Sequence, residues 1–426
     1  MIVDDLPLDR QRVDAFGLGG RLPALAVAPH DPATLAELQR RANDAGLGVV
    51  VFGGATLQSI GNAPTRYDLA ISLARLTRVL AYEPHDLTIG VEAGMTVADF
   101  NATLAEHGQF VPLDVPRASI ATIGGTLAAG WRGPRRTAYG SPRDLVIGTG
   151  TILADGTHAR AGGMVVKNVT GYDVGKLYIG SLGTLGTLVR VNFKCLPLPP
   201  VRRIAIAPLN DELRERALAH LAALAIEPTA ALLVRGFDAA TPDVKTDDPR
   251  LIVLFEGSDA LVERATRDLR SALGSAGVAS TTIVDRNPEQ AFARVIDAYT
   301  DTLVGRSITF RSTGRPSTVV ARFDTADRIA RDFVLHLDAI VDLCSGDLTL
   351  RFVAPKKNAF SQIAATLAAD LRMELVPCSL LAGDPAACAG IDAWGSAPSS
   401  LATMRTLKER FDERATLAPG RFVGGI

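Results

Sequence analysis

The stretch KNVTGYDVGKLYIGSLGTLG, residues 167–186, has glycine at every third position near its end, at Gly180, Gly183 and Gly186. The residues around these glycines alternate in the way that strands and turns do. Glycine weakens a strand and offers no side chain to pack, so it usually marks a place where another group approaches the backbone closely. We therefore expect this stretch to lie against something that needs bare backbone.

A second segment of this kind is VVFGGATLQSIGNAP, residues 50–64, in which a buried strand runs into Gly53 and Gly54. Ala55 and Thr56 follow, so successive backbone N–H groups have almost no side chain in front of them. Such a loop forms a concave nest for anionic oxygens such as those of a pyrophosphate. A glycine pair after a strand is also common in plain turns, and the pattern alone leaves both possibilities open.

The third segment is PLDVPRASIATIGGTLAAGWRGPRRTAYG, residues 112–140. A helix of such small residues has little to bury by itself, so it must lie against a flat and bulky partner. Arg135 and Arg136 could place positive charge beside a delocalised anion, or they could be solvated on a turn. One large planar ligand that passes all three segments explains them more simply than three unrelated turns.

Composition excludes several classes of protein. The 426 residues suffice for two or three domains. A formal net charge of -1 and an aromatic content of 5% argue against binding to nucleic acid or to an anionic membrane surface. The early residues lack the apolar core of a signal peptide, and no apolar run reaches the ~18 residues of a membrane span. We expect a cytoplasmic protein, attached to the inner membrane at most through partners.

The cysteines point to no metal site. None of the four has the CxxC spacing of a zinc or iron–sulfur ligand set, and we expect buried thiols in a reducing cytosol. These cysteines are Cys195, Cys344, Cys378 and Cys388.

The first half of the chain shows alternating strand and helix signals. Residues 24–28 predict a strand, and a helix follows with Asp31 as its N-cap and Pro32 at its first position. Thr96 caps a second helix, with Asp99 in the capping-box position. An Asp-Gly pair at 155–156 predicts a hairpin turn.

The prolines of KCLPLPPVRR predict a domain boundary near residue 199. Beyond it, strands interleave with helices, which favours an α+β layer. One helix begins at Ser258, with Leu261, Ala265, Leu269 and Leu273 on one face. Further helices are predicted over residues 289–299, 325–338 and 359–371.

Three segments, in this order, resemble one flavin family: EAGMTVADFNATLAEHGQFVPLD, ATIGGTLAAGWRGPRRTAYGSPRDLVIG and MVVKNVTGYDVGKLYIGSLGTLG. The family is the PCMH-type FAD-binding domain of the vanillyl-alcohol oxidase and D-2-hydroxyacid dehydrogenase superfamily. Within it the chain is most similar to FAD-binding subunits of bacterial glycolate oxidases. The resemblance implies an α+β fold in which a FAD-binding domain of two α/β subdomains, residues 1–199, precedes an α+β cap-like domain, residues 200–400. Residues 401–426 would form a tail that returns to the FAD domain.

The resemblance also implies how FAD is held, with the first loop around the pyrophosphate and the other two segments along the rest of the cofactor. The implied cofactor-binding residues are Gly53, Gly54, Ala55, Thr56, Pro116, Thr122, Gly124, Gly125, Ala128, Gly130, Arg135, Tyr139, Gly140, Gly183, Gly186 and Thr187. No His or Cys stands in the first loop, so FAD is expected to be non-covalent. The family's closing Asn-Pro-Gly appears here as Ala418-Pro419-Gly420, without the polar Asn.

Catalytic relatives carry a His-rich, metal-binding patch in the second domain, whereas this chain has only His220 and His336 there, far apart. The catalytic residues stay unknown, no metal is expected, and an auxiliary flavin subunit is favoured. Its implied partners are a homologous catalytic flavin subunit and an iron–sulfur subunit, and the complex would oxidise a small 2-hydroxy acid such as glycolate or D-lactate. The alternatives are a stand-alone FAD oxidoreductase of a small alcohol or 2-hydroxy acid, and a flavin-fold scaffold without FAD. A nicotinamide enzyme is disfavoured because no G-x-G-x-x-G follows the first strand.

Overall fold

A computed structural model describes residue 3 and residues 5–165, 172–242, 244, 248–301, 306–356 and 360–426. The first five residues of the stretch that opens the sequence analysis lie outside this part. The chain forms two compact units. Unit 1 comprises Met1–Arg132, Gly140–Pro197 and Asp392–Ile426, and unit 2 comprises Gly133–Tyr139 and Leu198–Ile391. The domain bounds expected from the sequence do not separate residues 133–139 from the first domain.

Unit 1 begins with a four-stranded sheet in the order β1-β2-β4-β3, in which β2, β4 and β3 are parallel and β1 is antiparallel to β2. The bounds are β1 Leu8–Arg10, β2 Leu25–Pro29, β3 Val49–Phe52, β4 Leu69–Ser72 and α1 Pro32–Asp44. The predicted cap of α1 is confirmed, because the Asp31 carboxylate accepts a hydrogen bond of 2.7 Å from the Thr34 N–H.

The second sheet of unit 1 has five antiparallel strands in the order β5-β6-β10-β8-β9. The Asp-Gly hairpin between β8 and β9 and the Thr96 cap of α2 are both confirmed. The bounds are β5 Val79–Glu83, β6 Thr88–Glu92, α2 Val97–Ala105, α3 Ile123–Ala128, β8 Val146–Ile152, β9 His158–Gly162 and β10 Thr187–Lys194. A short ribbon pairs β7 Gln109–Phe110 with β11 Leu196–Pro197.

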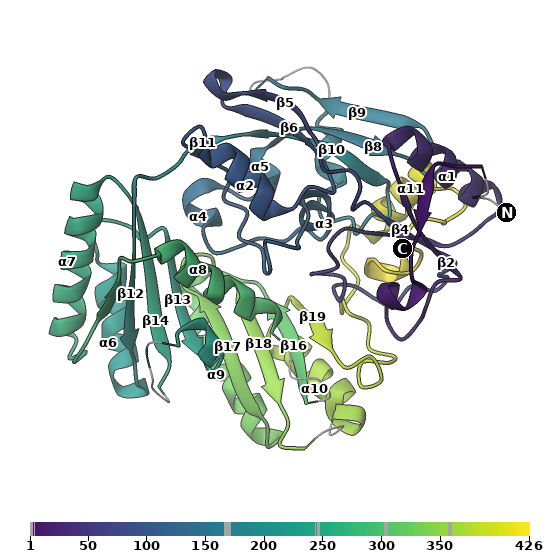
Figure 1. Cartoon of the computed structure of the whole chain (residues 1–426). Coiled ribbons are helices and arrows are strands. Elements are labelled where there is room, and N and C mark those ends of the chain that lie inside the picture. Colours follow the sequence, from purple (N-terminus) through teal and green to yellow (C-terminus); the bar gives the residue numbers. More distant parts are fainter. Residues whose placement is uncertain are drawn as a thin grey trace. The chain divides into compact units, whose positions relative to one another are not determined.

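The C-terminal segment completes unit 1. Helix α11, Leu401–Phe411, is followed by a tail in which Leu417 forms a parallel bridge with Val49 of β3. The Val49 N–H donates to the Thr416 carbonyl and the Ala418 N–H donates to the Val49 carbonyl, both at 2.7 Å. Figure 1 shows this yellow segment beside the purple N-terminal strands. The last residues of the chain therefore extend a sheet made by the first seventy.

Unit 2 is built on an eight-stranded antiparallel sheet in the order β15-β12-β14-β13-β17-β18-β16-β19. Helix α8 lies across one face, and α9 and α10 cover the other (Figure 1). The strands are β12 Val201–Pro208, β13 Ala230–Arg235, β14 Arg250–Gly257, β15 Thr282–Val284, β16 Ser307–Ser312, β17 His336–Asp342, β18 Leu348–Val353 and β19 Cys378–Gly383. The helices are α6 Asp211–Ala222, α7 Asp259–Ser275, α8 Pro288–Asp297, α9 Val319–Asp332 and α10 Phe360–Glu374.

Two expectations for unit 2 are wrong. The helix expected at 325–338 is α9, which ends at Asp332, because Val334 adopts a left-handed conformation with φ 56° and the Leu335 N–H caps the Ala330 carbonyl. On α7, Leu261 lies exposed, and its neighbour Val262 takes the buried position.

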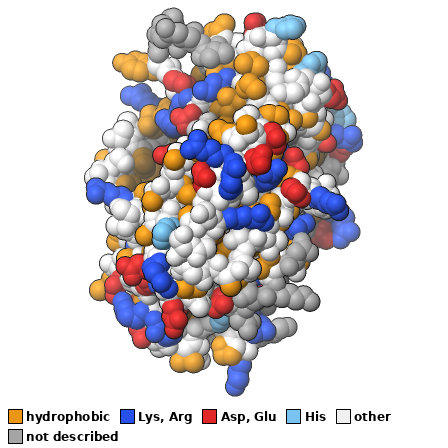
Figure 2. Space-filling view, turned by 90° about the vertical axis from the view of Figure 1, so that its left-hand side faces the viewer, with side chains coloured by type: hydrophobic (Ala, Val, Ile, Leu, Met, Phe, Trp, Pro, Cys, Tyr) orange, Lys and Arg blue, Asp and Glu red, His pale blue; other side chains and the backbone are white. Residues whose placement is uncertain are grey.

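Charged side chains of both signs are interspersed on the face shown in Figure 2, as the net charge of -1 leads one to expect. No helix in the described ranges is both long enough and apolar enough to cross a bilayer.

Candidate cofactor-binding site

The three small-residue segments meet at one cavity in unit 1. Its volume of about 710 Å³ includes space that is open to solvent. The lining consists of Val51, Gly53, Gly54, Ala55, Thr56, Leu57, Gln58, Leu73, Thr122, Gly124, Gly125, Ala128, Ala129, Leu182, Gly183, Gly186, Thr187, Leu188 and Arg421. Most of the cofactor-binding residues expected from the sequence are therefore brought together here. Those outside the lining are Pro116, Gly130, Arg135, Tyr139 and Gly140.

The glycines of the loop after β3 allow two chain segments to touch. A Cβ atom on Gly53 would lie 1.9 Å from Oγ1 of Thr122, and one on Gly54 would lie 1.8 Å from the Ile120 carbonyl oxygen. Both distances are far below van der Waals contact. Glycine at these positions lets the loop pack against the start of α3, so both segments can face the same cavity.

Gly183 plays a different part. Its φ of +76° lies in the left-handed region, and a Cβ built on it would meet no atom within 4 Å. Because Gly183 lines the cavity, that open space belongs to the cavity. Gly180 instead approaches another backbone, since a Cβ on Gly130 would lie 2.8 Å from the Gly180 Cα. The opening stretch thus meets bare backbone at Gly180 and open cavity at Gly183.

Arg135 and Tyr139 belong to unit 2, where they surround Glu256 of β14. Nη1 of Arg135 donates to Oε1 of Glu256 at 3.1 Å, and Nε of Arg202 donates to the same oxygen at 2.5 Å. The Glu256 side chain is fully buried, and burial, with this carboxylate beside it, raises the pKa of Tyr139. Arg136 pairs with Asp347 at 3.0 Å, also in unit 2.

Arg421 is the charged residue of the lining, and the sequence analysis missed it. Its side chain is only 2% exposed, and Nη2 donates to the carbonyls of Gln58 at 3.0 Å and Ile60 at 2.6 Å. Nη1 has no hydrogen-bond partner among the described residues. The available signal was the cation directly after Ala418-Pro419-Gly420, at the place where the family motif closes.

Comparison with known proteins assigns the first unit. Residues 23–162 match the family described as FAD binding domain (FAD_binding_4). The chain is similar to the glycolate oxidase subunit GlcE of Escherichia coli K12, with 32% identity over 232 residues, which cover 54% of this chain and 61% of that protein. It is also similar to D-2-hydroxyglutarate dehydrogenase of Xanthomonas citri pv. viticola, with 26% identity over 92% of this chain and 88% of that protein.

Among solved structures, p-cresol methylhydroxylase with substrate bound matches with a TM-score of 0.68 and 15% identity, covering 94% of this chain and 88% of that one. The fold is thus that of the PCMH-type flavoproteins. Residues 23–162 thus form a FAD binding domain, and FAD is the cofactor of that domain. The matched part of the chain spans less than two thirds of the length of the glycolate oxidase subunit.

The cavity fits FAD on two counts. Glycine, alanine and threonine make up most of its lining, which suits a long dinucleotide with a flat ring system. The buried hydroxyl of Thr187 and Nη1 of Arg421 have no hydrogen-bond partner in the described structure, and both residues line the cavity. FAD brings acceptors and negative charge that can use both groups.

The histidines lie elsewhere. None is among the residues that line the cavity. Nε2 of His336 lies 2.9 Å from Asp338 and Nε2 of His30 lies 3.1 Å from Asp9, both side chains being substantially exposed. In the described part of the chain, no group of three or more His, Cys, Asp or Glu side chains is arranged to hold a metal ion.

Proposed function

We propose that this chain is the FAD-binding, auxiliary subunit of an oxidoreductase complex that oxidises a small 2-hydroxy acid. The observation that carries the proposal is the cavity, in which three separated segments of small residues converge within a FAD-binding domain. Similarity to a glycolate oxidase subunit and to a D-2-hydroxyglutarate dehydrogenase supports the substrate class.

In this proposal the chain binds and orients the cofactor. The N–H groups of the Gly53–Thr56 loop would hold the diphosphate, and the start of α3 and the Gly183–Thr187 segment, with the Thr187 hydroxyl, would hold the remainder of FAD. When bound, FAD supplies the two-electron acceptor of the oxidation. The lining as described contains a single ionisable side chain, Arg421, so the cavity wall suits binding rather than proton transfer.

We assign the substrate chemistry to a homologous catalytic flavin subunit and onward electron transfer to an iron–sulfur subunit. The cysteines of this chain support that division. None of the four has the CxxC spacing that is typical of a cluster ligand set.

A second function is favoured by one specific observation. The alignment with D-2-hydroxyglutarate dehydrogenase runs over nearly the whole of both chains. In this second case the chain is a stand-alone FAD-dependent dehydrogenase of a 2-hydroxy acid, with its proton-accepting group in unit 2.

Anaerobic flavin reduction separates these functions. The chain is purified alone with FAD, then mixed with glycolate, D-lactate or D-2-hydroxyglutarate while the flavin absorption band is followed. The auxiliary role predicts a persistent band that bleaches only when the partner subunits are added. Rapid bleaching of the chain alone would establish the stand-alone enzyme instead. Purified protein that takes up no FAD would refute both and leave a scaffold.

A further inference from the structure

Arg421 differs from the other deeply buried arginines. Arg351 in unit 2 pairs with Asp338 at 2.7 Å and with Asp301 at 2.9 Å, and Arg250 pairs with Asp238 at 3.2 Å. Arg421 is equally buried, but its described contacts are the carbonyls of Gln58 and Ile60, with no ion pair to a described carboxylate. It therefore carries a cation into the wall of the cavity without a matching anion from the described residues.

Such an arrangement is unfavourable by itself. A buried charge without a counter-charge costs several kcal/mol in general, and folded proteins normally pair it. Burial lowers the pKa of Arg421 to about 10, so the group remains protonated at neutral pH. The two carbonyls satisfy Nη2, while Nη1 has no hydrogen-bond partner in the described structure, and Arg421 is one of the residues that line the cavity. An anionic ligand in the cavity would supply what this side chain lacks.

We propose that Arg421 binds the diphosphate of FAD and neutralises part of its charge, an inference that rests on the proposed use of the cavity. The diphosphate is the permanent negative charge of this cofactor, and guanidinium groups recognise phosphate oxygens by paired N–H donors. The position agrees, because the contacts to Gln58 and Ile60 hold the guanidinium at the end of the loop that begins with Gly53. Backbone N–H groups and one cation would then hold the diphosphate together.

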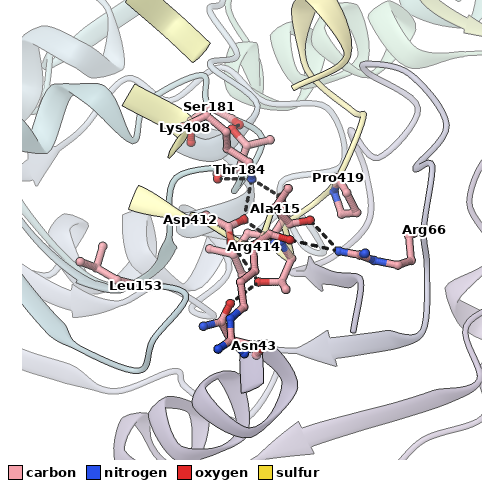
Figure 3. A network of polar contacts seen from close by, with 12 residues as sticks. Asn43, Arg66, Leu153, Ser181, Thr184, Lys408, Asp412, Arg414, Ala415 and Pro419 are labelled. Carbon is pink, nitrogen blue, oxygen red and sulfur yellow. Dashed lines mark hydrogen bonds and ion pairs between the residues drawn. The ribbon is translucent and has the colours of Figure 1, made fainter. Parts of the chain in front are cut away.

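The tail that carries Arg421 is fixed by a buried network, which Figure 3 shows. Nζ of Lys408 on α11 donates to Oδ2 of Asp412 at 2.6 Å, to the Leu417 carbonyl at 2.8 Å and to the Thr184 carbonyl at 2.9 Å. Asp412 in turn accepts a bond of 2.7 Å from the Leu417 N–H. Because Thr184 follows Gly183, one lysine ties the tail to the third segment of the cavity, so Arg421 is held in place before any ligand arrives.

The test compares ligands with and without phosphate. Apoprotein carrying Arg421→Gln or Arg421→Lys is titrated with FAD and, separately, with riboflavin, using quenching of flavin fluorescence. Arg421→Gln should weaken FAD about 10- to 100-fold, the usual worth of hydrogen bonds to a charged group, and change riboflavin affinity less than about threefold. Arg421→Lys should retain most of the FAD affinity. The matched control is Arg414→Gln, on the same tail, whose Nη1 donates to the carbonyls of Asn43 and Asp44.

A second measurement covers the case in which Arg421→Gln does not fold. The wild-type protein should bind ADP at least tenfold more tightly than adenosine, and added salt should weaken FAD more than riboflavin. Equal losses of FAD and riboflavin in the variant, or equal affinities for ADP and adenosine, would overturn the inference. Failure of the wild-type protein to bind FAD would instead refute the proposed function, so the two failures are distinct.

Discussion

The two units contain buried guanidinium groups in opposite settings. In unit 2, Arg135 and Arg202 meet the fully buried carboxylate of Glu256, and the charges satisfy one another. In unit 1, Arg421 lies in a cavity wall of backbone and small side chains and has carbonyls as its described partners. The difference separates two uses of a buried charge. A buried charge with a protein partner makes that partner costly to remove, whereas we propose that the buried charge without one receives its partner from a ligand.

The largest effect is expected from Glu256→Ala. Removing this carboxylate leaves Arg135 and Arg202, each with a side chain about one-eighth exposed, without their shared anion. Breaking a buried pair on one side typically costs ~3–5 kcal/mol. Urea unfolding should show that loss in the free energy of unfolding, while the flavin content per folded molecule stays unchanged.

Glu289→Ala is the matched control, because Glu289 also pairs with Arg202, at 3.1 Å, but has 65% of its side chain exposed. An exposed pair contributes at most about 1 kcal/mol. Equal losses in the two variants would show that burial of the pair is irrelevant, and the contrast between the units would fail.

The next effect is a pH dependence in unit 2. Burial raises the pKa of the Asp342 carboxyl to about 6, despite the hydrogen bonds from Ser345. The pKa of this carboxyl in the unfolded chain is near 4. Between that pH and the folded pKa, the native state binds more protons than the unfolded state does. The free energy of unfolding should therefore fall by about 2 kcal/mol as the pH rises from 4 to 6, and by about 3 kcal/mol over the complete titration of this group.

The Asp342→Asn variant has no carboxyl at this position and therefore lacks this titration. The difference between the wild-type and variant stability curves, measured by urea unfolding at several pH values, isolates the contribution of Asp342. Parallel curves over this pH interval would show that the carboxyl titrates normally.

In unit 1, glycine substitutions separate contact within the protein from contact with the ligand. Gly183→Leu should cost ~1–2 kcal/mol because of its left-handed backbone, and should also expel FAD because its side chain enters the cavity. Gly46→Leu has a similar φ of +66° and equally open space around its Cβ, but Gly46 lies outside the cavity lining. It should cost the same stability and retain FAD.

Gly54→Ala tests the other role of glycine, since its Cβ would collide with the Ile120 carbonyl. Overpacking of this kind costs ~1–3 kcal/mol. We expect both stability and flavin content to fall, as measured by urea unfolding and by the flavin absorption of the purified protein. Full flavin content in both Gly54→Ala and Gly183→Leu would place FAD elsewhere.

The smallest effect is expected on the surface of unit 2. Arg264 and Asp268 form a pair of 3.4 Å one turn apart on α7, with side chains 63% and 39% exposed. Asp268→Asn should change the free energy of unfolding by less than about 0.5 kcal/mol. A larger loss would mean that exposure does not govern the strength of these pairs.

Local signals account for what the sequence predicted well. Asp31 and Thr96 act on N–H groups three residues away, and the Asp-Gly turn links adjacent strands, so neither depends on the rest of the fold. The small-residue segments were recognisable because residues with so little side chain to pack indicate that another group approaches the backbone closely. The boundary between α9 and β17 was missed because it depends on a left-handed valine, which is a rare choice of residue for that conformation.

The residues whose positions could not be predicted are those with partners far away in the sequence. The sequence around Arg135 does not indicate Glu256 as its partner, because Glu256 lies 121 positions away. Arg135 could therefore be assigned to unit 2 only from the structure. Arg421 meets Ile60 across 361 positions, and its place in the cavity has no local signature beyond the motif that precedes it. Side chains whose partners are so distant can be assigned only when the sheets are known.

Because the C-terminal tail pairs with β3, the first sheet of unit 1 is completed only after the end of the chain has been synthesised. Ribosomes add roughly 5–20 residues each second, so about 20–70 s pass between the emergence of Ile60 and that of Arg421, 361 positions later. Throughout this interval β3 lacks the neighbour formed by Thr416–Ala418. With the role proposed for Arg421, the FAD site is complete only after translation has passed this residue, and a nascent chain stalled before that point would expose an open sheet edge to chaperones and proteases.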